Sequence, residues 1–112
     1  PMGADLPNQA LNHAASAIEA AAAIAVCATA TIPQLGFIHE DPGQSFVLDI
    51  ADLWRDPVTI PCAFKAARIA LDRPGENVER LARRLTGETI ARKGVVPAMI
   101  ERIKALIEGR DP

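Results

Sequence analysis

Apolar residues recur along this chain at the spacing of amphipathic helices, and proline and glycine separate the helical stretches. Alanine, leucine and isoleucine dominate the apolar residues, while aromatic residues make up only 4% of the chain, which favours helix over sheet. The pattern therefore predicts an all-α fold, a compact bundle of about five helices in a single domain of residues 1–112. The predicted helices cover about residues 8–30, 45–55, 61–71, 76–85 and 97–108.

Capping residues, proline and glycine set the predicted boundaries. Asp5 is expected to cap the first helix, with Pro7 tolerated in its first turn. Pro57 is expected to end the second helix, because the residue before a proline avoids the helical region. Gly87 is expected to break the fourth helix.

The helical period also predicts which side chains face the core. The alanines of the first helix allow neighbouring helices to approach closely. The larger or regularly spaced inward residues are Leu11, Ile18, Ile24 and Val26 in the first helix, Ala63, Phe64, Ala67 and Leu71 in the third, and Met99, Ile100, Ile103 and Ile107 in the last.

The stretch from 45 to 55 carries the most distinctive pattern. Ser45 is a natural N-cap, and the apolar residues that follow form one stripe of an amphipathic helix. Asp49 and Asp52 are three residues apart, so their side chains project from neighbouring points at the border of that stripe. Two carboxylates beside a buried surface repel each other and lose hydration, and a cation between them would relieve both penalties.

His39 precedes the two aspartates by ten and thirteen residues. An imidazole and carboxylates can together ligate Mg²⁺, Mn²⁺ or Zn²⁺, so His39, Asp49 and Asp52 are candidate metal-site residues. The alternatives stay open at this point: a hydrogen-bonded structural histidine, and an aspartate pair at a solvated helix edge.

The net charge of −2 conceals an asymmetry between the two halves of the chain. Residues 1–54 carry six acids and no Lys or Arg, whereas residues 55–112 carry all twelve bases and eight acids. The first half would attract cations, and the second half could face a polyanion. Candidate phosphate-contacting residues are Arg55, Arg80, Arg83 and Arg84. Solvated arginines that pair with Glu76, Glu79 and Glu88 are the alternative for the last three.

Two features bear on localisation. Cys27 and Cys62 lack a paired spacing and are interpreted as buried free thiols of a cytoplasmic protein. The alanine-rich run at residues 14–30 has no basic residue before it and is interrupted by Glu19, so a packed internal helix is preferred over a signal peptide or membrane span.

The motifs around the histidine and the aspartates resemble a known family. The run Gly36-Phe37-Ile38-His39, a short loop, and then Ser45-Phe46-Val47-Leu48-Asp49-Ile50-Ala51-Asp52 resembles the active-site signature of the CRISPR-associated spacer-acquisition integrase, the Cas-one family, in its subtype I-E branch. The resemblance extends from Asn8-Gln9 to the Pro74-Gly75-Glu76 turn and so covers most of the chain.

The resemblance implies an all-helical C-terminal catalytic domain that holds Mg²⁺ or Mn²⁺. It assigns His39 and Asp52 as metal ligands and Asp49 as a second aspartate needed for activity. It further implies an endonuclease that inserts short DNA fragments into a repeat array, and a complex in which two integrase homodimers flank a dimer of the Cas-two partner protein.

The chain also departs from the family pattern. The family's glutamate ligand lies on a helix upstream of the matched region, and its N-terminal β-rich domain is absent here. Glu19 stands where this branch often has tyrosine and is not taken as a replacement ligand. The chain is therefore expected to be a C-terminal fragment of a larger integrase and, alone, a weak or inactive nuclease. The rival hypotheses are a non-catalytic helical dimerisation or partner-binding module, and a small DNA-binding regulator.

Overall fold

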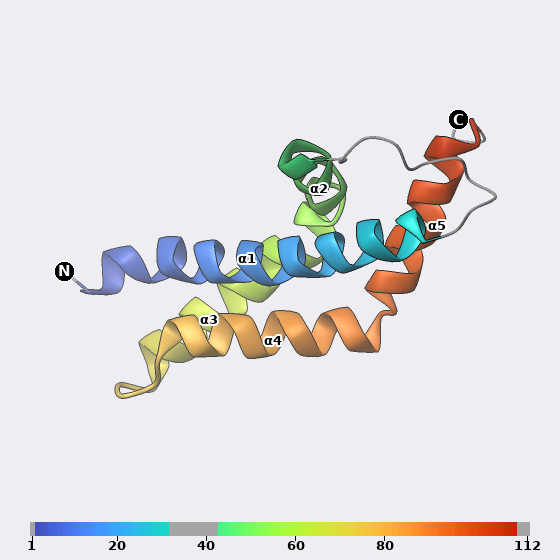
Figure 1. Ribbon diagram of the computed structural model, residues 1–112. Coiled ribbons are helices and arrows are strands. Elements are labelled where there is room, and N and C mark those ends of the chain that lie inside the picture. The colour runs from blue at the N-terminus through green and yellow to red at the C-terminus, as the bar shows by residue number, and fades with distance from the viewer. Residues whose placement is uncertain (1, 32–42, 110–112) are drawn as a thin grey trace.

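The computed structural model describes residues 2–31 and 43–109, and within these ranges it is entirely helical apart from turns. Figure 1 shows the order of the elements. They are α1 (Met2–Ala30), α2 (Gly43–Asp52), the π-helical turn η2 (Arg55–Thr59), α3 (Ile60–Asp72), α4 (Val78–Arg92) and α5 (Val95–Ile107). The prediction of an all-α fold is confirmed.

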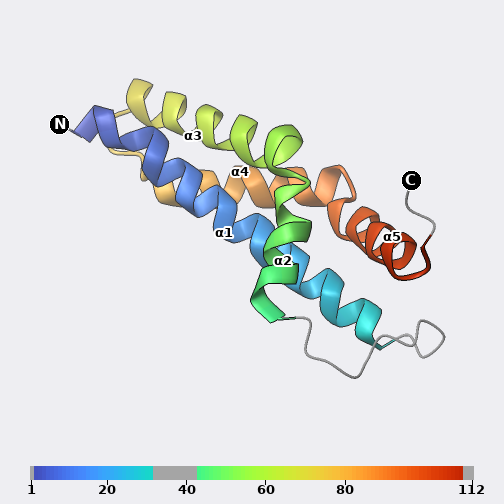
Figure 2. The ribbon, with the colours of Figure 1, turned by 90° about the horizontal axis from the view of Figure 1, so that it is seen from above.

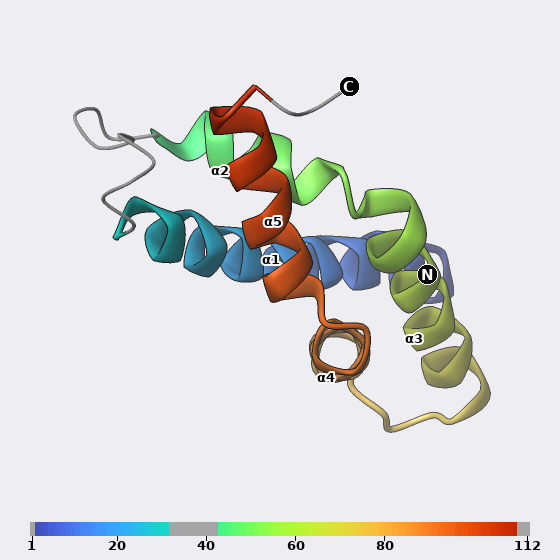
Figure 3. The same ribbon diagram turned by 90° about the vertical axis from the view of Figure 1, so that its right-hand side faces the viewer.

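The long helix α1 is the element on which the others pack. It contacts α2, η2, α3, α4 and α5. Figures 1 and 3 show α2 and α4 on opposite sides of α1, while Figure 2 shows α3 running beside its N-terminal part. The whole is elongated, with extents of 51 × 24 × 23 Å.

Alanine makes this packing possible. Along the N-terminal half of α1, Ala10 and Ala14 are fully buried against a cluster built mainly from alanines of α3 and α4. Small side chains let helix axes approach closely, so many dispersion contacts form although each side chain is small. Towards the C-terminal half of α1 the core becomes bulkier, and Ile50, Met99 and Ile103 are fully buried there.

Helix α1 begins earlier than expected. It starts at Met2, so Asp5 lies inside its first turn and does not cap it. There the carboxylate still lies near the positive end of the helix dipole. In α2 the helix begins at Gly43, so Ser45 is likewise an internal residue and the prediction of an N-cap is wrong.

Pro57 does not mark the end of the aspartate helix, because α2 already ends at Asp52 and Pro57 lies inside η2. The backbone N–H groups of Val58 and Thr59 both donate to the carbonyl oxygen of Trp54, which forms the wide η2 turn. Pro57 occupies the first turn of this segment, where its missing N–H leaves no acceptor unpaired. The chain then continues directly into α3.

Gly87 lies within α4 and does not break it. A glycine in an exposed helix interior costs about 1 kcal/mol relative to alanine, and the packing of α4 on α1 and α3 outweighs that penalty. The N-cap is Asn77, whose Oδ1 accepts from the backbone N–H of Arg80 at 2.9 Å.

The inward face of α5 is confirmed, because Met99 and Ile103 are fully buried. The predicted inward face of α3 is partly wrong. Ala63 and Ala67 are buried, but Phe64 and Leu71 are 62% and 65% exposed. The alanine stripe of α3 lies against α1 and α4, and this turns the two larger side chains outward.

Two residues of α1 are also more exposed than predicted. Ile24 is 60% exposed, and Cys27 is exposed, although both cysteines are free as expected. By length and composition alone, residues 5–30 could cross a membrane, and 39% of the most apolar window is buried inside the protein. Their packing against five other elements is that of the core helix of a globular fold.

The close approach at Ala14 gives the first testable prediction. Ala14→Leu forces a large side chain between helices and should lower the free energy of unfolding by about 1–3 kcal/mol in urea titrations. Ala20 is exposed on the same helix, so Ala20→Leu should stay close to the wild type. Equal midpoints for the two variants would contradict close packing at Ala14.

Candidate functional site

Asp49 and Asp52 lie in the last turn of α2, on either side of two buried residues. Ile50 and Ala51 are 1% and 5% exposed and pack in the core cluster that includes α1. The two carboxylates are exposed. They therefore border the packed face of the helix, as the sequence predicts.

Both carboxylates stand in an unfavourable local field. The C-terminal end of a helix carries partial negative charge, which destabilises a nearby anion by roughly 0.3–1 kcal/mol. The last turn of α2 contains no basic residue, and neither aspartate forms a hydrogen bond or ion pair within the described residues. A bound cation would remove this repulsion.

Asp49 and Asp52 line one cavity of about 420 Å³ together with residues of α1 and η2. The polar members of its lining are Asn12, Glu19, Asp49, Asp52, Arg55 and Thr59. Among the residues of the lining that the structure describes, three carboxylates and one guanidinium give a net negative charge. The arrangement can attract a cation and present oxygen ligands to it.

Glu19, which the sequence analysis did not take as a ligand, also lines this cavity. It follows Asn12 and Ala15 at helical spacing on α1, so all three line the same side of the cavity. The available signal was a single acid within an alanine-rich run.

His39 lies outside the described residues, so its position relative to the aspartates stays a prediction. Within residues 2–31 and 43–109, no three His, Cys, Asp or Glu side chains lie close enough together to hold a metal ion. The donor chemistry of Asp49 and Asp52 nevertheless fits Mg²⁺ or Mn²⁺, because these ions prefer carboxylate oxygen and tolerate imidazole and water.

Thr59 is a cavity residue that the sequence reasoning missed. It is 3% exposed, lines the cavity, and its Oγ1 has no hydrogen-bond partner within the described residues. The residue precedes α3 but has helical backbone angles, so its hydroxyl does not cap the helix. The π-helical turn η2 ends at this residue, and such turns occur frequently at functional sites.

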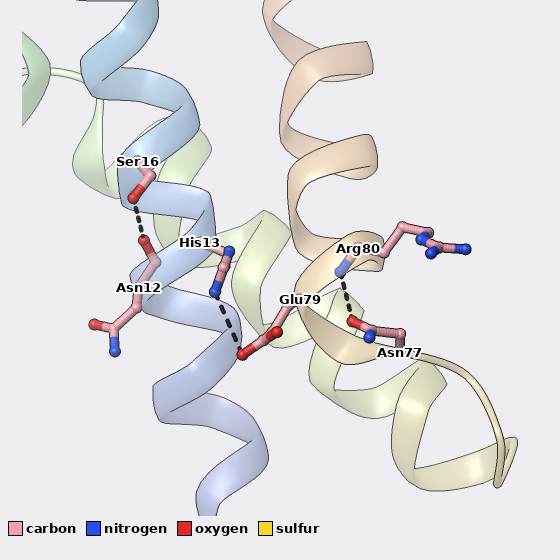
Figure 4. A network of polar contacts seen from close by, with 6 residues as sticks. All are labelled: Asn12, His13, Ser16, Asn77, Glu79 and Arg80. Carbon is pink, nitrogen blue, oxygen red and sulfur yellow. Dashed lines mark hydrogen bonds and ion pairs between the residues drawn. The ribbon is translucent and has the colours of Figure 1, made fainter.

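The four candidate phosphate-contacting arginines do not lie together. Arg55 lines the acidic cavity, whereas Arg80, Arg83 and Arg84 belong to α4, on the other side of α1 (Figures 1 and 3). Nε of Arg84 lies 4.0 Å from a Glu88 oxygen, in one of the ion pairs that the sequence allowed. Figure 4 shows the Arg80 side chain pointing away from α1.

The other histidine, His13, has a structural partner. Its Nε2 lies 3.4 Å from Oε2 of Glu79 and connects α1 to α4 (Figure 4). Both side chains are partly exposed, so the pair contributes little to stability. His13 is absent from the lining of the acidic cavity.

Comparison with known proteins finds several similar sequences. The chain is 36% identical over 102 residues to the CRISPR-associated endonuclease Cas1 3 of Methanospirillum hungatei, covering 91% of this chain and 34% of that protein. It is 34% identical over 110 residues to Cas1 1 of Rhodospirillum rubrum, covering 94% and 34%. It is 31% identical over 110 residues to Cas1 of Escherichia coli K12, covering 96% and 35%.

The chain thus spans about a third of the length of the curated relatives that it matches, and it corresponds to their C-terminal part. No protein-family model and no solved structure matches it.

The unpartnered hydroxyl of Thr59 gives the second prediction. Thr59→Val keeps the shape of the side chain and removes a buried polar group without a partner, so it should raise the free energy of unfolding by about 1 kcal/mol. Thermal melts measure the stability of the variant, and Thr59→Ser, which retains the hydroxyl, serves as the control. A loss of stability in Thr59→Val would mean that water or a ligand in the cavity bonds to Oγ1.

Proposed function

Because the chain belongs to the CRISPR-associated endonuclease Cas1 family, we propose that it forms the helical catalytic part of a divalent-metal-dependent DNA endonuclease and integrase. This activity would insert short DNA fragments into a repeat array during spacer acquisition. The single observation that supports it best is the shared cavity of Asp49 and Asp52, whose charges have no partner within the described residues.

In this proposal His39 and Asp52 hold Mg²⁺ or Mn²⁺, and Asp49 supports the same ion. The metal, when bound, neutralises charge that develops on the phosphodiester and on the leaving oxygen. Asp49 and Asp52 come from one turn of one helix, so their spacing is fixed before an ion binds, and little ordering entropy is lost on binding.

Arg55 has a separate role in the proposal. It lines the same cavity as the carboxylates and supplies the only positive side chain among the described residues of that lining. A guanidinium at this place can pair with a phosphate that approaches the carboxylates, which would otherwise repel it. Arg55 would therefore position the DNA backbone next to the ion.

The wider assembly also belongs to the proposal. We expect the complete protein to act in the cytoplasm as a homodimer, on DNA, together with the Cas-two partner protein. The competing function is a helical module without catalysis, which assembles with partners through its surface. The two functions differ in whether Asp52 binds a metal ion.

Calorimetric titration with Mn²⁺ tests the proposal. We expect the wild type to bind the ion, and Asp52→Asn to weaken binding at least about tenfold, because it removes a charged ligand. Asp72 is exposed at the end of α3, outside the acidic cavity, so Asp72→Asn makes the same charge change as a control. Binding that Asp52→Asn leaves unchanged would contradict the proposal, and no heat with the wild type would favour the non-catalytic module.

A further inference from the structure

Glu19 lines the acidic cavity but has no role in the metal site proposed above. It projects from α1, whereas Asp49 and Asp52 lie on α2. Within residues 2–31 and 43–109 no three acidic, His or Cys side chains gather closely enough to hold a metal ion, so Glu19 does not complete the aspartate pair. It is partly buried and forms no hydrogen bond or ion pair within the described residues. A carboxylate in this position gains from a cation of its own.

Thr59 is a second and independent sign of a ligand in the same cavity. Its side chain is 3% exposed, and its Oγ1 has no hydrogen-bond partner among the described residues. A buried hydroxyl without a partner costs free energy, and a ligand in the cavity could supply the missing hydrogen bond. Thr59 belongs to η2, which packs against α1, so the hydroxyl and the Glu19 carboxylate come from two neighbouring elements of the cavity wall.

The cavity is larger than a single ion needs, and part of its wall is apolar. Its volume is about 420 Å³, whereas about 10–15 Å³ is enough for one water molecule. Cavities of this size, with an apolar wall and a few polar groups, are typical sites for small organic ligands. The net negative charge of the described lining favours a cation among such ligands. The apolar residues of the lining are Leu11, Ala15, Ile18, Leu48 and Ala51.

We propose that Glu19 and Thr59 bind a primary ammonium group whose alkyl stem lies along the apolar part of the cavity wall. An ammonium has three N–H donors, and the Glu19 carboxylate, Thr59 Oγ1 and the Asn12 side-chain carbonyl are acceptors in the same lining. Alkyl stems of this kind pack on apolar surface while the charged end stays paired. A divalent metal ion suits these groups less well, because it gives up its water shell reluctantly and that shell would lie against apolar side chains.

The ammonium group belongs to a free aliphatic amine or to a lysine side chain of another protein, because both carry the same chemistry. Its charge would cancel that of Glu19 and so weaken the repulsion that a phosphate meets in the acidic cavity. The inference goes beyond the proposed function and does not rest on the metal site.

The test uses n-butylamine, which carries one ammonium on a short alkyl stem. It is titrated into the nitrogen-15-labelled full chain in metal-free buffer at neutral pH, and amide signals are followed by nuclear magnetic resonance. The signals of Glu19 and Thr59 should shift and saturate. Glu19→Gln should weaken binding at least about tenfold, because a hydrogen bond between charged groups is lost. Thr59→Val should weaken it about threefold, whereas Thr59→Ser keeps the hydroxyl and should bind as the wild type does.

Matched controls separate this site from general charge effects and from the metal site. Glu76 is exposed and does not line the cavity, so Glu76→Gln removes the same charge and should leave the affinity within about twofold. Asp52→Asn should weaken Mn²⁺ binding far more than butylamine binding, and Glu19→Gln should have the opposite preference. Failure of the ammonium site and failure of the proposed function are therefore distinguishable.

Two further probes identify the source of the ammonium group. Tighter binding of 1,4-diaminobutane than of butylamine would indicate a free diamine, whose second ammonium reaches the aspartates. Tighter binding of Nα-acetyl-lysine methylamide would indicate a lysine side chain of a partner protein.

Three results would overturn the inference: no saturable shift in the wild type, equal losses in Glu19→Gln and Glu76→Gln, or equally tight binding of butyltrimethylammonium, which has no N–H donor. Displacement of butylamine by potassium chloride at equal concentration would overturn it too, because the cavity would then accept any cation. Circular dichroism melts of every variant verify that the fold is retained.

Discussion

The close contact of alanine faces is the constraint on which this structure depends. Ala10 and Ala14 of α1 have no exposed surface, and the residues that cover them are mostly alanines of α3 and α4. A chain of 112 residues has little apolar volume to bury, so its stability depends on short distances between helices more than on large side chains. The same constraint turns larger residues outward wherever they share a helix with an alanine stripe. Phe64 is the clearest case, and its exposure is a consequence of packing.

The candidate site lies on α2, which packs on this framework, and its two carboxylates carry an electrostatic penalty there. Ile50 and Ala51 attach α2 to the core, which fixes the last turn of that helix beside α1. Asp49 and Asp52 then stand at the negative end of a helix dipole without a basic neighbour in that turn. Stability alone would favour neutral or basic residues at these positions, and natural proteins accept such conflicts mainly where function requires them. Thr59, with a buried hydroxyl and no partner within the described residues, is a second conflict in the same lining.

The hydrophobic period was sufficient to predict an all-α fold, five helices and the inward face of α5. It failed where two physical effects compete. Pro57 was expected to end a helix, but it lies inside the π-helical turn η2, where its missing N–H leaves no acceptor unpaired. Gly87 was expected to break a helix, but the packing of α4 on α1 and α3 sustains that helix. The i,i+3 spacing placed Asp49 and Asp52 at one border of α2, which the structure bears out. Glu19 and Thr59 come from other elements, and only tertiary contacts could bring them to that cavity.

The central claim is that His39 joins Asp49 and Asp52 around one divalent ion. Since the chain has only two histidines, nuclear magnetic resonance of the imidazole protons during substoichiometric Mn²⁺ addition tests it most directly. If His39 joins the site, the paramagnetic ion should broaden its signals far more strongly than those of His13, which pairs with Glu79 and follows the cavity-lining Asn12. Equal broadening of both histidines, or broadening of His13 alone, would contradict it.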